Sequence, residues 1–119
     1  HTIPLSNRAM EILRNIVRGE PDEQIFKGQN SIIPSDQFMT SLLKKRMGYD
    51  AHVHGFRSTF KDWAREKTNY PDEWSEIALA HVNSDATRAA YARSSLISNR
   101  REMMNNWELL CNQHYICNS

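Results

Sequence analysis

The chain has 119 residues, of which 39% are hydrophobic and 24% are charged, and its 15 basic residues nearly balance its 14 acidic ones. This length suffices for one domain around one core, and the composition is typical of a folded globular chain. Its longest apolar runs are three or four residues, far below the roughly 20 that a membrane-spanning helix needs, so we expect no transmembrane segment. A net charge of +1 neither indicates nor excludes a polyanionic partner.

The chain begins at His1, with neither an initiator methionine nor a secretory signal. We therefore expect an excised fragment of a cytoplasmic protein. Cys111 and Cys117 lie six residues apart in a stretch that we expect to be helical. That spacing separates their Cα atoms by about 9 Å, beyond the roughly 4.4–6.8 Å that a disulfide accepts, so we expect reduced thiols.

The first predicted helix covers residues 7–18. Ser6 is suited to cap its start, and Gly19 is suited to end it. Residues 19–34 combine glycine and proline with short apolar pairs, which predicts a loop with one short strand-like segment.

The second predicted helix begins after a cap at Ser35 or Asp36 and is closed by Gly48. A basic run at residues 44–46 is expected near its solvent side. Its predicted apolar face consists of Phe38, Met39, Leu42, Leu43 and Met47.

A third helix is predicted from His54 to about Lys67, and a fourth should begin with Pro71 as its first residue and stop just before His81. The core face predicted for the third helix consists of Phe56, Phe60, Trp63 and Ala64. Trp63, Trp74 and Trp107 all fall on apolar helical faces, so we expect them in the core and not stacked on bases.

Ser84 is suited to cap a short helix on which Thr87, Arg88 and Tyr91 project together. A last helix is expected beyond Ser95. Its apolar residues are Met103, Met104, Trp107 and Leu110. The sequence therefore predicts a mainly α-helical fold in a single domain, residues 1–119.

His54 and Arg57 are three residues apart, which on a helical turn places both side chains on one face, where they can grip one phosphate. Chance alone supplies roughly 0.4 such pairs in a chain of this composition, so the pair by itself is weak evidence for a phosphate site. The spacing of two further residues is more specific. His81 comes 24 residues after Arg57, and Tyr91 comes ten residues after His81.

This succession, with the flanking stretch His-Gly-Phe-Arg-Ser-Thr-Phe at residues 54–60, closely resembles the catalytic domain of the tyrosine recombinases. The nearest branch resembles the integrases of prophages, satellite phages and genomic islands. The resemblance covers most of the chain, from residues 3–6, which are similar to the end of the family's β-hairpin, to Trp107 in the closing helix.

The resemblance implies a site-specific recombinase that cleaves and rejoins DNA through a 3′-phosphotyrosine intermediate, with no metal or other cofactor. It assigns Tyr91 as nucleophile, Arg57 as phosphate clamp, His54 as acid/base assistant and His81 as a hydrogen-bond donor to the phosphate. These residue types suit the roles. Tyrosine, with a pKa of about 10, is only about 0.1% ionised at pH 7 and needs activation, and arginine presents a planar fork of donors to two phosphate oxygens.

The family pattern also includes a second arginine and a lysine that protonates the leaving oxygen. Both are expected upstream of His1, together with further helices and most of the β-hairpin, so we expect the fragment itself to be inactive. Lys27, Lys44 and Lys45 do not occupy positions that would replace the lysine. Ala80 stands where many relatives have glycine.

By the same resemblance, the partners are double-stranded DNA attachment sites, three further copies of the chain in a homotetramer on DNA, and accessory DNA-bending proteins, with a monomer expected off DNA and no membrane. The alternative is a non-catalytic helical DNA-binding module, and a purely structural helical domain is a third possibility. Metal binding by His52 and His54, or by Cys111, His114 and Cys117, is disfavoured because the two cysteines would point about 240° apart on a helix.

Overall fold

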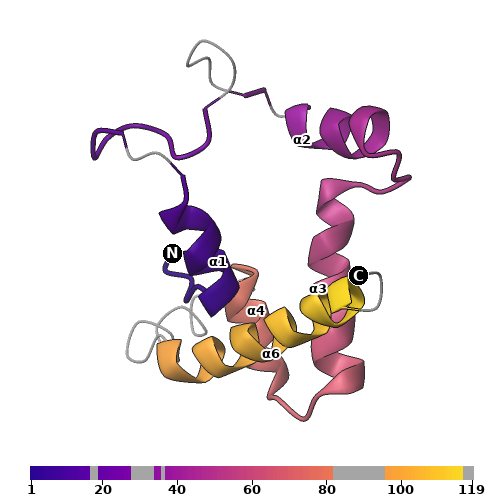
Figure 1. Ribbon diagram of the computed structural model, residues 1–119. Coiled ribbons are helices and arrows are strands. Elements are labelled where there is room, and N and C mark those ends of the chain that lie inside the picture. The colour runs from indigo at the N-terminus through magenta and orange to yellow at the C-terminus, as the bar shows by residue number, and fades with distance from the viewer. Residues whose placement is uncertain (17–18, 28–33, 36, 82–95, 117–119) are drawn as a thin grey trace.

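A computed structural model describes residues 1–16, 19–27, 34–35, 37–81 and 96–116 (Figure 1). In these residues all regular structure is helical, which confirms the predicted mainly α fold. The elements are α1 (Asn7–Arg14), α2 (Phe38–Ser41), one π-helical turn η2 (Leu42–Arg46), α3 (Val53–Lys67), α4 (Asp72–Ala78) and α6 (Ile97–Ile116). None of the described helices is both long and apolar enough to cross a membrane.

The core forms where α6 crosses α3 and α4 (Figure 1). The ring of Trp107 lies edge-on to Phe60, with ring centres 5.4 Å apart, and 5.1 Å from Trp63. The buried cluster itself consists of Phe60, Trp63, Ala64 and Met103. Partly buried side chains packed against it are Tyr70, Trp74, Ala78, Leu79, Met104, Trp107 and Leu110. The core positions predicted for all three tryptophans and for the last helix are therefore confirmed.

Helix α1 starts as predicted but ends early. The Ser6 hydroxyl accepts a hydrogen bond from the Ala9 main-chain N–H, and Asn15 forms the C-terminal cap. The predicted end at residue 18 is wrong, because residues 15 and 16 have already left the helix. The Arg8 main-chain N–H donates to the Glu108 carboxylate at 2.8 Å, which joins the start of α1 to α6.

The N-terminal residues 1–6 form no strand, so the similarity of residues 3–6 to a β-hairpin end is not matched by structure in this chain. The strand-like segment expected in residues 19–34 is absent from residues 19–27 and 34, and its remaining residues lie outside the described part of the chain. A strand needs a neighbour to pair with, and no described segment offers these residues an edge.

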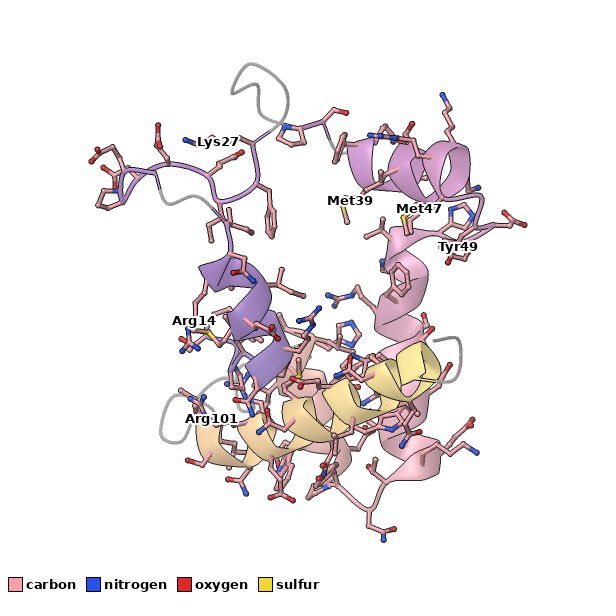
Figure 2. All side chains as sticks on the ribbon, in the orientation of Figure 1. Arg14, Lys27, Met39, Met47, Tyr49 and Arg101 are labelled. Atoms are coloured by element: carbon pink, nitrogen blue, oxygen red, sulfur yellow. The ribbon has the colours of Figure 1, made fainter. Side chains whose placement is uncertain are left out.

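The α2–η2 segment, residues 38–46, differs from the prediction in its cap and in its burial. Gln37 is the N-terminal cap, with no side-chain hydrogen bond, so the cap predicted at Ser35 is wrong, and Asp36 lies outside the described residues. Leu43 alone of the predicted apolar face is buried, whereas Met39 and Met47 are 50% and 53% exposed. The segment lies apart from the core, and Met39 and Met47 project from the same side of it (Figures 1 and 2). Gly48, with φ of 73°, ends it as predicted.

Helix α3 matches its predicted span, but Phe56 is 53% exposed and does not belong to the core face. It lies on the first turns of α3, which extend beyond the region that α6 covers (Figure 1). Pro71 is the N-terminal cap of α4 and not its first residue, because its ψ of 133° is extended. The helix predicted after Ser84 and the pairing of Cys117 lie outside the described residues.

Candidate active site

Three of the four predicted site residues line one pocket of about 160 Å³. His54 and Arg57 come from α3, and His81 comes from the turn that follows α4. The other lining residues are Ser58, Lys61 and Asp62, all on α3. Helices α3 and α4 pack against each other, and this contact brings together residues that are more than 20 positions apart in the sequence.

The helical period explains why α3 presents this set. His54, Arg57 and Lys61 are spaced by three and four residues, so they follow one stripe along the helix. Phe60 and Trp63 lie on the stripe that enters the core. Packing of the apolar stripe therefore orients the polar stripe toward the end of α4.

His81 is held by a C-terminal capping motif of α4. The His81 main-chain N–H donates to the Glu76 carbonyl at 2.9 Å, and the Ala80 N–H donates to the Ile77 carbonyl at 3.0 Å. Ala80 itself has φ of 56°, the left-handed conformation that this motif requires. The pair of hydrogen bonds is the Schellman pattern, and it fixes the main chain of His81 directly after the helix.

Arg57 is anchored at the same helix end. Its Nη2 donates to the Leu79 carbonyl at 2.5 Å, and the side chain is partly buried. A cation is favourable there because the carbonyls at a helix C-terminus carry partial negative charge. A guanidinium has five N–H donors, so this hydrogen bond leaves donors for an anion in the pocket.

Lys61 is a buried cation that the sequence interpretation did not single out. Its Nζ donates to Asp72 Oδ1 at 2.7 Å and to Ser75 Oγ at 2.8 Å, and it also pairs with the Glu76 carboxylate. An ammonium group has three N–H donors, and these contacts use all three. The only sequence signal was its spacing of four residues from Arg57, on the polar stripe of α3.

Glu76 bridges this cation and His81. Its Oε1 pairs with Lys61, and its Oε2 lies 3.3 Å from Nδ1 of His81. One carboxylate therefore contacts a buried ammonium on α3 and an exposed imidazole beyond α4.

Asp72 ties α4 to α3 at the opposite end of the helix. Hydrogen bonds from Arg65 and then from Lys61 hold the pKa of the Asp72 carboxyl below its ordinary value. The same pairing raises the pKa of Arg65. These contacts make the packing of α4 on α3, and hence the pocket, dependent on ionised side chains.

The remaining predicted residues lie elsewhere. Tyr91 is outside the described part of the chain, so its distance from the pocket is not defined. Lys27 pairs with Glu23, and Lys44 lies 3.8 Å from Asp50. Neither lysine lines the pocket. The described residues contain no group of three or more histidine, cysteine or acidic side chains arranged to hold a metal.

The curated proteins that the chain matches include phage and prophage integrases. It is 32% identical to prophage integrase IntZ of Escherichia coli (strain K12) over 110 residues, and 33% identical to prophage integrase IntA of the same strain over 117 residues. It is 30% identical to the integrase of Shigella phage Sf6 over 112 residues. Each match covers 90% of this chain but only 27–29% of the relative, so the chain spans little more than a quarter of the length of these relatives.

No family profile and no solved structure matches the chain. The resemblance of residues 54–91 to the tyrosine recombinases is supported by the curated relatives, which match the chain over a longer stretch. Over nine tenths of its own length, this chain is similar in sequence to phage and prophage integrases.

Proposed function

We propose that the chain is the C-terminal part of the catalytic domain of a site-specific DNA recombinase, which cleaves and rejoins DNA through a 3′-phosphotyrosine intermediate. The observation that carries the proposal is the shared pocket. His54, Arg57 and His81 line it from two separate elements, and all three side chains can donate hydrogen bonds to a phosphate. The integrase relatives supply the class of reaction.

In the proposed cleavage step, the Tyr91 hydroxyl oxygen attacks the phosphorus of one DNA strand. A phosphorus–oxygen bond to the tyrosine forms while the bond to the 5′ oxygen breaks. His54 accepts the phenolic proton, and the 5′ oxygen takes a proton from a general acid and leaves as a hydroxyl. Arg57 and His81 stabilise the charge that builds on the non-bridging oxygens. Rejoining is the same exchange in reverse, and it needs neither ATP nor metal.

Lys61 is a poor candidate for the general acid, although it lines the pocket. Its ammonium protons are engaged by Asp72, Ser75 and Glu76. The lysine that the family resemblance implies, on a segment preceding this chain, is the proposed donor. Because that lysine and a second arginine complete the proposed machinery, the chain alone should not cleave DNA.

The proposed partners are duplex attachment sites and, on DNA, three further copies of the protein, with accessory DNA-bending proteins. Helix α6 contributes to the core of its own chain, because Met103 and Trp107 pack against α3. We expect deletion of residues 96–119 to destabilise the fold as well as any tetramer. Light scattering with and without DNA, on a protein first shown to be folded, measures the assembly.

A nicked suicide substrate tests the proposal. When the longest natural polypeptide containing this sequence is incubated with it, the nick lets the short 5′ product diffuse away, and a covalent protein–DNA adduct should accumulate. The alternative DNA-binding module would shift the DNA in a salt-dependent manner without forming the adduct. A purely structural domain would do neither.

A further inference from the structure

We propose that Glu76 is a positioning residue for His81, and that Lys61 in turn holds the Glu76 carboxylate in place. The importance of this arrangement for catalysis rests on the proposed function. The arrangement itself rests on contacts within the described residues.

Glu76 fixes His81 at two points. Its carbonyl accepts the His81 main-chain N–H at 2.9 Å, which sets where the residue leaves α4. Its Oε2 lies 3.3 Å from the ring nitrogen Nδ1, which limits rotation of the imidazole. A histidine 44% exposed at its side chain would otherwise sample several rotamers.

The carboxylate is itself immobilised from the core side. Lys61 is buried, and its Nζ is surrounded by oxygens of Asp72, Ser75 and Glu76. A buried ammonium that loses an acceptor leaves an N–H without a partner, which is costly away from water, so Lys61 retains the Oε1 oxygen of Glu76. The second oxygen, Oε2, is then directed at the imidazole.

This geometry decides which ring nitrogen can serve a ligand. The closeness of Oε2 to Nδ1 favours a proton on Nδ1, and Nε2 is then the nitrogen left for the pocket that His81 lines. A ring protonated at both nitrogens donates to the carboxylate and to a phosphate oxygen at the same time. Glu76 thereby orients the group that we propose to stabilise the transition state.

Replacement by glutamine distinguishes this role from a general effect of charge. Glutamine has nearly the same shape as glutamate but only one side-chain oxygen. The buried Lys61 ammonium binds this oxygen more strongly than the exposed His81 ring does. The amide NH₂ then faces Nδ1 of His81 and donates to it. In a neutral ring the proton must consequently move from Nδ1 to Nε2.

The tautomer can be read by ¹⁵N–¹H NMR of the His81 ring in the 119-residue chain, at a pH where the ring gives the spectrum of a neutral imidazole. We expect Nδ1–H in the unmodified chain and Nε2–H in Glu76→Gln. Glu73→Gln is the matched control, because Glu73 is an exposed acidic residue in the first turn of the same helix, and it should retain Nδ1–H. Helical circular dichroism confirms that each variant is folded.

A proton on Nε2 in the unmodified chain, or an unchanged tautomer in folded Glu76→Gln, would overturn the positioning role. The rate of adduct formation on the suicide substrate is a separate readout, taken in the longer polypeptide. There Glu76→Gln should lower the rate by about 10- to 100-fold, by analogy with residues that orient metal-bound histidines. DNA affinity should remain within about twofold.

The two readouts separate the two proposals. If the unmodified protein forms no adduct, the proposed function fails, and the NMR result alone decides whether Glu76 positions His81. If the adduct forms and Glu76→Gln forms it equally fast, the catalytic importance of Glu76 is refuted.

Discussion

Nη2 of Arg57 and the main-chain oxygen of Leu79 are 2.5 Å apart, so the guanidinium of α3 caps the C-terminal end of α4. The Schellman turn that carries His81 begins at that same end. One arginine therefore joins the two elements that form the candidate site and remains at its pocket. Its structural and its proposed catalytic roles use different donors of one group.

Arg57→Lys should impair both roles. A lysine keeps the charge but has no planar fork, so we expect adduct formation to fall by about 10²-fold or more. Loss of the hydrogen bond to Leu79 should also lower the free energy of unfolding by about 1 kcal/mol. Suicide-substrate kinetics and urea unfolding measure the two effects.

Arg101→Lys is the matched control for this variant, since Arg101 is exposed on α6, outside the pocket. It should form the adduct at the unmodified rate. If Arg57→Lys cleaved DNA as fast as Arg101→Lys, the clamp role of Arg57 would be wrong.

Ala80→Gly should stabilise the fold by about 1 kcal/mol. Ala80 has φ of 56°, where the β-carbon of alanine is crowded and glycine is not. Ala78→Gly, within α4, should have the opposite sign, with a loss of about 0.5–1 kcal/mol or more. Urea unfolding of both variants checks the pair. A destabilising Ala80→Gly would mean that residue 80 does not adopt the left-handed conformation.

The stability of the α3–α4 contact should depend on pH through Asp72. Its pKa in the folded chain lies below the ordinary value because Arg65 and then Lys61 donate to it. Its contribution is therefore complete above the unfolded pKa of about 3.9 and is lost as the pH falls from there through the folded pKa.

Urea unfolding of the unmodified chain and of Asp72→Asn at neutral and at strongly acidic pH tests this dependence. The unmodified chain should be the more stable at neutral pH, and the difference should shrink on acidification. Glu73→Gln controls for removal of a negative charge from the same helix. A difference that grows at low pH would contradict the pairing.

Met103 and Phe56 provide a contrast between a buried and an exposed apolar residue. Met103 is 0% exposed, so Met103→Ala should cost about 2–5 kcal/mol of unfolding free energy. Phe56 is 53% exposed, and Phe56→Ala should cost much less, under about 1 kcal/mol. If both variants lost the same free energy of unfolding, Phe56 would occupy the core position that its helical spacing predicts.

These cases show what could be predicted from the sequence. The span of α3, the presence of α6 and the burial of Trp63 follow from apolar residues at helical spacing, a signal that is local. The exposure of Phe56 and Met39 could not be predicted in this way. Periodicity marks an apolar face but does not say whether another element covers it.

In the candidate site, too, the features that depend on local spacing could be predicted, and those that depend on packing between helices could not. The pairing of His54 with Arg57 follows from their spacing on one helix. The approach of His81 required the packing of α4 on α3, and the family resemblance supplied that expectation. Lys61 and Glu76 were missed because their contacts form only through that packing.

The proposed mechanism depends above all on Tyr91 as the nucleophile, and the decisive measurement is the mass spectrum of the protein–DNA adduct from the suicide substrate. The adducted peptide should contain Tyr91, and Tyr91→Phe should bind DNA with unchanged affinity but form no adduct, since it lacks the attacking oxygen. Tyr49→Phe, which alters an exposed tyrosine before α3, should still form it. A Tyr91→Phe protein that becomes covalently joined to DNA would contradict the mechanism.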